Sequence, residues 1–263
     1  MRLILCTAVF TAHVLAAASS PAWQILTEGA AEGSGYKRSE AISALGTIRS
    51  AEADKLVVAA LADKDIMVRL AAVSALAERK SRADTPMLRK ALNDESGEVS
   101  FIAARALWEM GDRSGRDVLE EVMFGEQKKQ GFIAKQIRGA KATAHDRKGL
   151  VWMGAKEGAG FLFGPLGTGL GLMEQAMKDD AAQARVISAT LLAQERGPEA
   201  AGLLGEVLVD KNPLVRAVAA KLLGGFNGPS VRAKLEPLLE DKNDTVRYMA
   251  AASIVRVGRK SKR

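Results

Sequence analysis

Apolar residues recur along this chain at steps of three and four, in short stripes that polar turns separate. Examples are residues 71–76, 218–223 and 250–255. This spacing places apolar side chains on one face of an α-helix, and the many alanines let neighbouring helices approach closely. After the turn, Pro86 and Pro198 stand where a second helix would begin, because proline suits the first helical turn. The pattern predicts helical hairpins and an all-α protein.

A seven-residue signature precedes these stripes: an Asp, five residues and an Arg, with a Val directly before the Arg. It occupies residues 63–69, 210–216 and 241–247. At 94–100 a Ser replaces the Arg, and at 179–185 an Ala replaces the Val. The Arg position recurs every 31 residues, at 38, 69 and 100 and again at 185, 216 and 247. A fixed period of this length predicts stacked repeats, a solenoid that works by offering an extended surface.

The spacing and residue types resemble HEAT repeats, in the short form found in phycobilin lyases and many bacterial proteins. The resemblance covers about residues 36–124 and 179–257 and implies a right-handed α-solenoid of helical hairpins. It also implies a structural ladder of hydrogen bonds and ion pairs between adjacent repeats. Its members would be Asp63, Arg69, Asp94, Asp179, Arg185, Asp210, Arg216, Asp241 and Arg247. Ser100 departs from the pattern, so a rung should be missing there, and each turn aspartate is expected to cap the following helix.

Composition divides the chain into five segments. They are a signal peptide (1–18), N-terminal HEAT-like repeats (19–124), a basic and Gly-rich irregular insertion (125–178), C-terminal HEAT-like repeats (179–257) and a basic tail (258–263). Residues 20–31 are predicted to form a lone second helix that caps the stack, with Ser20 as its cap and Pro21 in its first turn. The last repeat lacks a second helix of its own. Trp108 replaces a small residue of the repeat, and we expect it to lie in the core.

The signal peptide is predicted because Arg2 precedes an apolar run that ends in small residues at 16–18. Cleavage after Ala22 is an alternative, and so is an ordinary N-terminal helix of the solenoid. The prediction implies an exported protein, in the periplasm or outside the cell. Removal of the signal peptide would take away Cys6 and His13, so the mature chain would contain no cysteine and one histidine, His145.

That composition limits the chemistry. Without cysteine, no disulfide forms, and one histidine does not supply a Cys/His zinc site or the His–Glu pairs of HEAT-fold diiron hydroxylases. We therefore expect no cofactor, no metal and no catalysis, and we expect His145 to be a solvated loop residue. The net charge is +7, or +6 without Arg2, which is too moderate to predict a nucleic-acid partner. A HEAT-like DNA glycosylase is kept as a minor alternative.

The insertion at 125–178 breaks the 31-residue register. Its first half is basic, and its second half, residues 149–173, is apolar and rich in glycine. The glycines lack the Gly-Lys-Ser/Thr of a phosphate loop and the spacing of a dinucleotide fingerprint. Three interpretations stay open: a degenerate repeat that packs tightly, a segment that inserts partway into a membrane, and a partner-binding insertion. Candidate contacts are Lys128, Lys129, Lys135, Arg138, Lys141, Trp152, Phe161 and Phe163.

The predicted function is a non-catalytic protein–protein interaction scaffold of the cell envelope or exterior. By resemblance, binding would use the concave face of the second helices, where Lys55, Lys90, Glu120, Glu206 and Lys234 are candidates. The alternative is an adaptor for an anionic membrane surface or an acidic polymer, using residues 128–173. A third hypothesis, a chromophore lyase or chaperone, rests on fold analogy alone.

Overall fold

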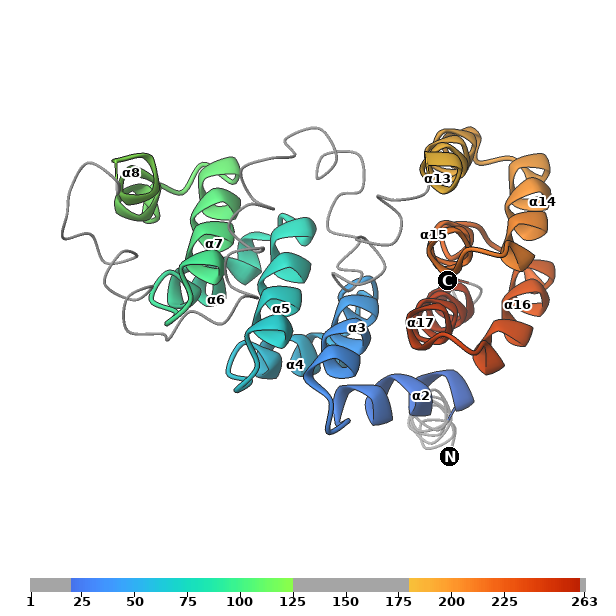
Figure 1. Cartoon of the computed structure of the whole chain (residues 1–263), viewed down its shortest axis with the longest axis horizontal. Coiled ribbons are helices and arrows are strands. Elements are labelled where there is room, and N and C mark those ends of the chain that lie inside the picture. The colour runs from blue at the N-terminus through green and yellow to red at the C-terminus, as the bar shows by residue number, and fades with distance from the viewer. Residues whose placement is uncertain (1–19, 125–179, 261–263) are drawn as a thin grey trace, which may run out of the picture. The chain divides into compact units, whose positions relative to one another are not determined.

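A computed structural model describes residues 20–124 and 180–260 of the chain. The expectations for the signal peptide, the insertion, Asp179 and most of the basic tail lie outside these residues. Every regular element in the described ranges is an α-helix or a short 3-10 helix (Figure 1). The prediction of an all-α protein is confirmed. The chain divides into two compact units, one formed by residues 1–54 and 168–263 and the other by residues 55–167.

In the second unit, two helical hairpins follow one another. Helix α4 (Ala51–Ala60) leads into it across the division between the units. The elements that follow are α5 (Ile66–Arg79), η1 (Arg82–Asp84), α6 (Thr85–Ala91), α7 (Gly97–Glu109) and α8 (Arg116–Phe124). The first helices α5 and α7 pack side by side, and α6 packs against α7. Pro86 stands in the first turn of α6, as its position in the sequence predicts.

The first unit joins the two ends of the chain. Its N-terminal helices are α2 (Pro21–Ala30) and α3 (Gly35–Gly46). Its C-terminal elements are α13 (Asp180–Leu192), η2 (Ala193–Glu195), α14 (Pro198–Glu206), η3 (Val207–Val209), α15 (Pro213–Leu223), α16 (Pro229–Leu235), η4 (Glu236–Glu240) and α17 (Asp244–Lys260). Helices α13, α15 and α17 stack in order, and α3 then packs on α17 (Figure 1). The row of first helices thus passes from the C-terminal repeats to the N-terminal one without a break.

Helix α2 supplies the second helix that the last repeat lacks. It packs on both α17 and α3, and its Ala22 and Leu26 are buried. Ser20 accepts a hydrogen bond from the Trp23 amide, which caps the helix as expected. The expected lone capping helix is therefore the second half of a composite repeat, whose first half lies at the other end of the chain.

Fully buried leucines recur with the repeat period. Leu45, Leu76 and Leu107 are 31 residues apart and each is 0% exposed. Leu223 and Ile254 show the same spacing in the C-terminal repeats and are 0% and 3% exposed. Fully burying one such side chain contributes about 1.5–3 kcal/mol to the free energy of unfolding. These buried apolar side chains therefore supply most of the stability of each repeat.

The turn aspartates do not cap the following helix, which corrects an expectation from the sequence. Instead, each accepts the amide of the residue two positions on; Asp63 and Asp210, for example, accept from Asp65 and Asn212, both at 2.8 Å. That second residue is the true cap: Asp65 accepts from Met67, and Asn212 from Leu214. The two carboxylate oxygens of the turn aspartate are needed for the ladder as well, so the capping function passes to its neighbour.

Candidate protein-interaction site

The ladder residues are held in a repeated geometry. Arg69 Nε donates to Asp94 Oδ2 at 3.0 Å, and Nη2 donates to Oδ1 at 3.1 Å. Its third donor, Nη1, reaches the backbone oxygen of Asp63 at 2.9 Å. The Arg69 and Asp94 side chains are only 7% and 10% exposed. Nη2 also pairs with the exposed Glu95 at 2.8 Å. This arginine therefore clamps two successive turns together.

The C-terminal repeats contain the same clamp. Arg216 donates to Asp241 through Nε and Nη2, both at 2.8 Å, and to the Asp210 backbone oxygen at 2.7 Å. Arg185 pairs with Asp210 at 2.8 Å and is more exposed. Burial opposes the charge of Asp241, but the hydrogen bonds from Arg216 and the Asn243 amide outweigh it and lower the pKa of this carboxyl.

Two rungs differ from the pattern. Ser100 replaces an arginine, and its hydroxyl donates only to the Asp94 backbone oxygen, at 3.3 Å. Arg247 donates to the Asp241 backbone oxygen and pairs with Asp244, not with the turn aspartate of another repeat. At this junction Lys37 of α3 bridges Asp244 at 3.8 Å and Glu32 at 3.6 Å.

Glu32 occupies the turn position 31 residues before Asp63. Arg38 donates through Nη1 to the backbone oxygens of Glu32 and Gly33, both at 2.9 Å, as Arg69 does one repeat later. The turn that follows the composite repeat thus keeps the ladder geometry. The sequence signature does not identify this turn, because a glutamate replaces the aspartate.

Trp108 is not in the core, and that expectation is wrong. The indole is 43% exposed at the end of α7, and the Arg113 guanidinium lies 3.9 Å from its ring centre. Arg113 Nη1 also donates to the Trp108 backbone oxygen at 2.9 Å, which holds the stack in place. The equivalent small residues, Ala77 and Gly46, are themselves partly exposed, so a tryptophan at this position adds surface rather than packing.

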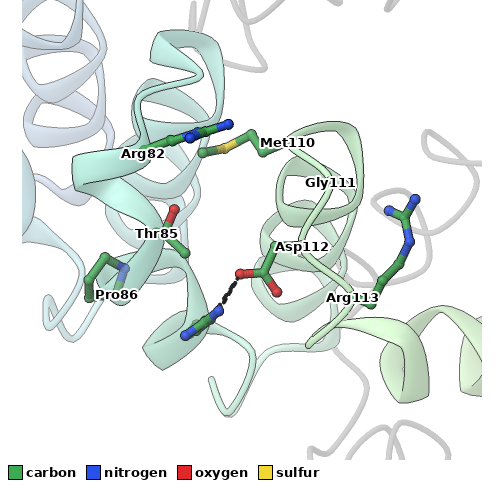
Figure 2. A pocket seen from close by; sticks show the side chains of 8 residues that line it. Arg82, Thr85, Pro86, Met110, Gly111, Asp112 and Arg113 are labelled. Carbon is green, nitrogen blue, oxygen red and sulfur yellow. Dashed lines mark hydrogen bonds and ion pairs between the residues drawn. The ribbon is translucent and has the colours of Figure 1, made fainter.

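Beside this stack, an open hollow of about 570 Å³ lies between α6 and the turn that joins α7 to α8. Figure 2 shows Arg82 and Met110 at one end, Thr85 between, and the Asp112 carboxylate pointing inward at the other end. Arg89 donates to Asp112 Oδ2 from Nε at 2.9 Å and from Nη2 at 2.6 Å. Arg113 also lines the hollow, but its guanidinium points away from the centre (Figure 2) and stacks on Trp108.

Asp112 is held in its charged form. It accepts from the Ser114 hydroxyl at 2.6 Å and the Ser114 amide at 2.9 Å. These bonds, together with Arg89, lower its pKa to about 2. The carboxylate therefore orients Arg89 at all physiological pH values.

The sequence candidates are distributed elsewhere. The five charged side chains expected on the second helices are all exposed, on α4, α6, α8, α14 and α16: Lys55, Lys90, Glu120, Glu206 and Lys234. None of them lines the hollow. The candidates at 128–163, including Lys128, Trp152 and Phe163, lie outside the described residues. The groups that line the hollow were missed; the available signal was Trp108, at a position where earlier repeats have Ala77 and Gly46.

Within residues 20–124 and 180–260, no three His, Cys, Asp or Glu side chains gather closely enough to hold a metal ion. In the part of the chain that the structure describes, no helix combines the length and apolar character needed to cross a membrane.

The stacked hairpins and their Asp–Arg clamps define a helical-repeat solenoid. The family model of HEAT repeats matches residues 23–108 and 170–255, which is more than half of the chain. The chain belongs to the HEAT-repeat family, and the resemblance stated from the sequence is confirmed. A solved structure of human deoxyhypusine hydroxylase in complex with glycerol is similar, with 16% identity and a TM-score of 0.38, over 91% of this chain and 97% of that one. No curated protein sequence matches the chain.

Proposed function

We propose that this chain is a non-catalytic scaffold that binds a protein partner in the cell envelope or outside the cell. HEAT repeats generally mediate protein–protein interaction, through the extended surface that stacked hairpins provide.

The exposed Trp108–Arg113 stack is the observation that carries the proposal. Tryptophan and arginine are the residue types most enriched among those that dominate binding energy at protein interfaces. Here the pair is already ordered in the free chain by a stack and a hydrogen bond. An ordered pair loses less conformational entropy on binding than two free side chains do.

Site-specific photo-crosslinking tests the scaffold function. A benzophenone amino acid placed at Trp108 in cells of the source organism should give one discrete protein adduct. The same amino acid at Lys242, an exposed turn residue of the other unit, serves as the control. If positions on every repeat give no adduct, the scaffold function is wrong.

Export needs a separate test, because the proposed location rests on the predicted signal peptide. Residues 1–22 fused to a reporter that is active only after export should yield activity. Val9→Asp places a charge inside the apolar run and should abolish that activity. Equal activity of both fusions would contradict export through this segment.

The membrane-adaptor alternative rests on residues 128–173, which the structure does not describe. Co-sedimentation of the chain with anionic and neutral vesicles separates it from the scaffold. Salt-sensitive binding that disappears on deletion of residues 126–176 would favour the adaptor, since attraction to anionic lipid weakens with ionic strength.

A further inference from the structure

Resting on the scaffold function above, we propose that the hollow beside Trp108 binds an acidic peptide segment of the protein partner. The arginine groove, as we name it, is formed by Arg82, Thr85, Pro86, Arg89, Met110 and Asp112. Its proposed ligand carries two or more carboxylates with an apolar residue beside them.

Arg82 supplies a free positive charge. Its side chain is exposed on η1, directly before α6, and it forms no ion pair with any carboxylate in residues 20–124 or 180–260. Other exposed arginines of this unit are already paired: Arg105 with Glu109 at 3.8 Å and Arg116 with Glu120 at 2.6 Å. A planar guanidinium offers a fork of donors that matches a carboxylate, and such pairs are short and strong.

Arg89 supplies a second, oriented donor. Asp112 takes only Nε and Nη2 of this guanidinium, through a single oxygen. The Arg89 side chain remains 58% exposed, so Nη1 is left for a ligand. Because Ser114 fixes Asp112 in turn, Arg89 is held in one direction before any ligand arrives. A donor that is ordered in advance adds affinity by lowering the entropy lost on binding.

The groove is also partly apolar. Met110 lines it beside Arg82, and Pro86 lines it from α6 (Figure 2). Arg113, which stacks on Trp108, is a further lining residue. A guanidinium that stacks on an indole retains the donors in its own plane, so Arg113 can still hydrogen-bond a ligand. A peptide that alternates carboxylates with an apolar side chain would meet both kinds of surface.

The surrounding charges disfavour a long polyanion. Between residues 82 and 120 the chain has six basic and eight acidic side chains. A nucleic acid or an anionic membrane would need a wide basic surface, because its affinity comes from many phosphate contacts. A local cluster of arginines in an acidic neighbourhood suits a short segment, with the nearby carboxylates rejecting a larger anionic surface.

The test uses fluorescence anisotropy with the full chain and a labelled peptide, acetyl-Glu-Glu-Leu-Glu-Glu-amide, at low salt. The matched probe replaces every Glu by Gln. Arg82→Ala should weaken binding of the acidic peptide about tenfold, the effect of losing one charge-assisted contact. Arg232→Ala removes the same charge from an exposed i,i+4 pair in the other unit and should change binding less than about twofold.

A second measurement locates the peptide. The indole N–H resonance of Trp108, assigned by its loss in Trp108→Phe, should shift on titration with the acidic peptide. The proposal is overturned if the Gln peptide binds equally, if Arg82→Ala has no effect, or if inorganic phosphate displaces the peptide at equal concentration. Tighter binding of single-stranded DNA or of anionic vesicles, with the same dependence on Arg82, would also overturn it.

The outcomes separate the groove from the scaffold function. The acidic peptide could fail to bind while the photo-crosslink at Trp108 still forms in the Arg82→Ala variant. The scaffold function would then be supported, and the proposal that the arginine groove binds the partner would be wrong. If no position crosslinks to a protein, the scaffold function fails whatever the peptide does.

Discussion

Gly29 of α2 lies directly against the ring of Tyr248 of α17, although 219 positions separate them in the sequence. A Cβ atom added to Gly29 would lie 2.5 Å from Tyr248 Cε1 and 2.7 Å from Cζ. Tyr248 is only 4% exposed, so its ring has little room to move. This contact lets the N-terminal helix complete the C-terminal repeat.

We therefore predict that Gly29→Ala destabilises the protein by about 1–2 kcal/mol, because overpacking outweighs the better helix propensity of alanine. Gly202→Ala in α14 is the matched control, since no atom lies within 4 Å of the added Cβ. The control should be stabilised by roughly 0.5–1 kcal/mol. Urea unfolding measures both. Equal stabilisation of the two variants would contradict the tight contact at Gly29.

The composite repeat predicts that the chain tolerates circular permutation. Joining residue 263 to residue 20 by a Gly/Ser linker, with new termini inside residues 125–178, makes the first unit contiguous in sequence. Its contacts are unchanged, so the permuted chain should fold with a similar unfolding midpoint, measured by circular dichroism. Deletion of residues 20–31 is the control: it uncovers the Tyr248 ring that Gly29 contacts and should lower the midpoint strongly. A permuted chain that is as unstable as this deletion would contradict the composite repeat.

The buried rungs should matter far more than the exposed ion pairs. Arg216→Ala leaves Asp241 nearly buried without its partner, which costs about 3–5 kcal/mol. Arg232→Ala removes an exposed i,i+4 partner of Glu236 and should cost about 0–1 kcal/mol. Denaturant unfolding of both variants at one pH gives the comparison. Similar small losses would show that the ladder adds little to stability.

The ladder also predicts how stability depends on pH. The pKa of Asp241 is lower in the folded chain than its ordinary value, so the folded state favours the charged carboxylate. Its contribution is present in full above the ordinary aspartate pKa, about 3.9, and is lost as the pH falls through the lower folded value. Asp241→Asn should thus be less stable than the natural chain at neutral pH, and the difference should shrink below pH ~4. A constant difference down to the most acid condition would argue against a charged Asp241.

The sequence by itself determined the helical hairpins, their 31-residue period and the membership of the ladder pattern. These follow from local rules: apolar steps of three and four make helices, and proline marks their first turns. Even the caps two residues after each turn aspartate could have been found, because Asp65 and Ser96 lie 31 apart, as do Asn212 and Asn243.

Only the tertiary structure decided which repeats are neighbours. The repeat pattern shows that a helix has an apolar face, but not which other apolar face covers it. For that reason the packing of α2 on α17 could not be deduced from the sequence, where the two helices lie far apart and the repeat pattern relates only consecutive helices. The exposure of Trp108 was decided in the same way, since an aromatic residue packs inside or stands out according to the space its neighbours leave. The arginine groove, assembled from α6 and a turn about 25 residues later, likewise exists only once the hairpins are stacked.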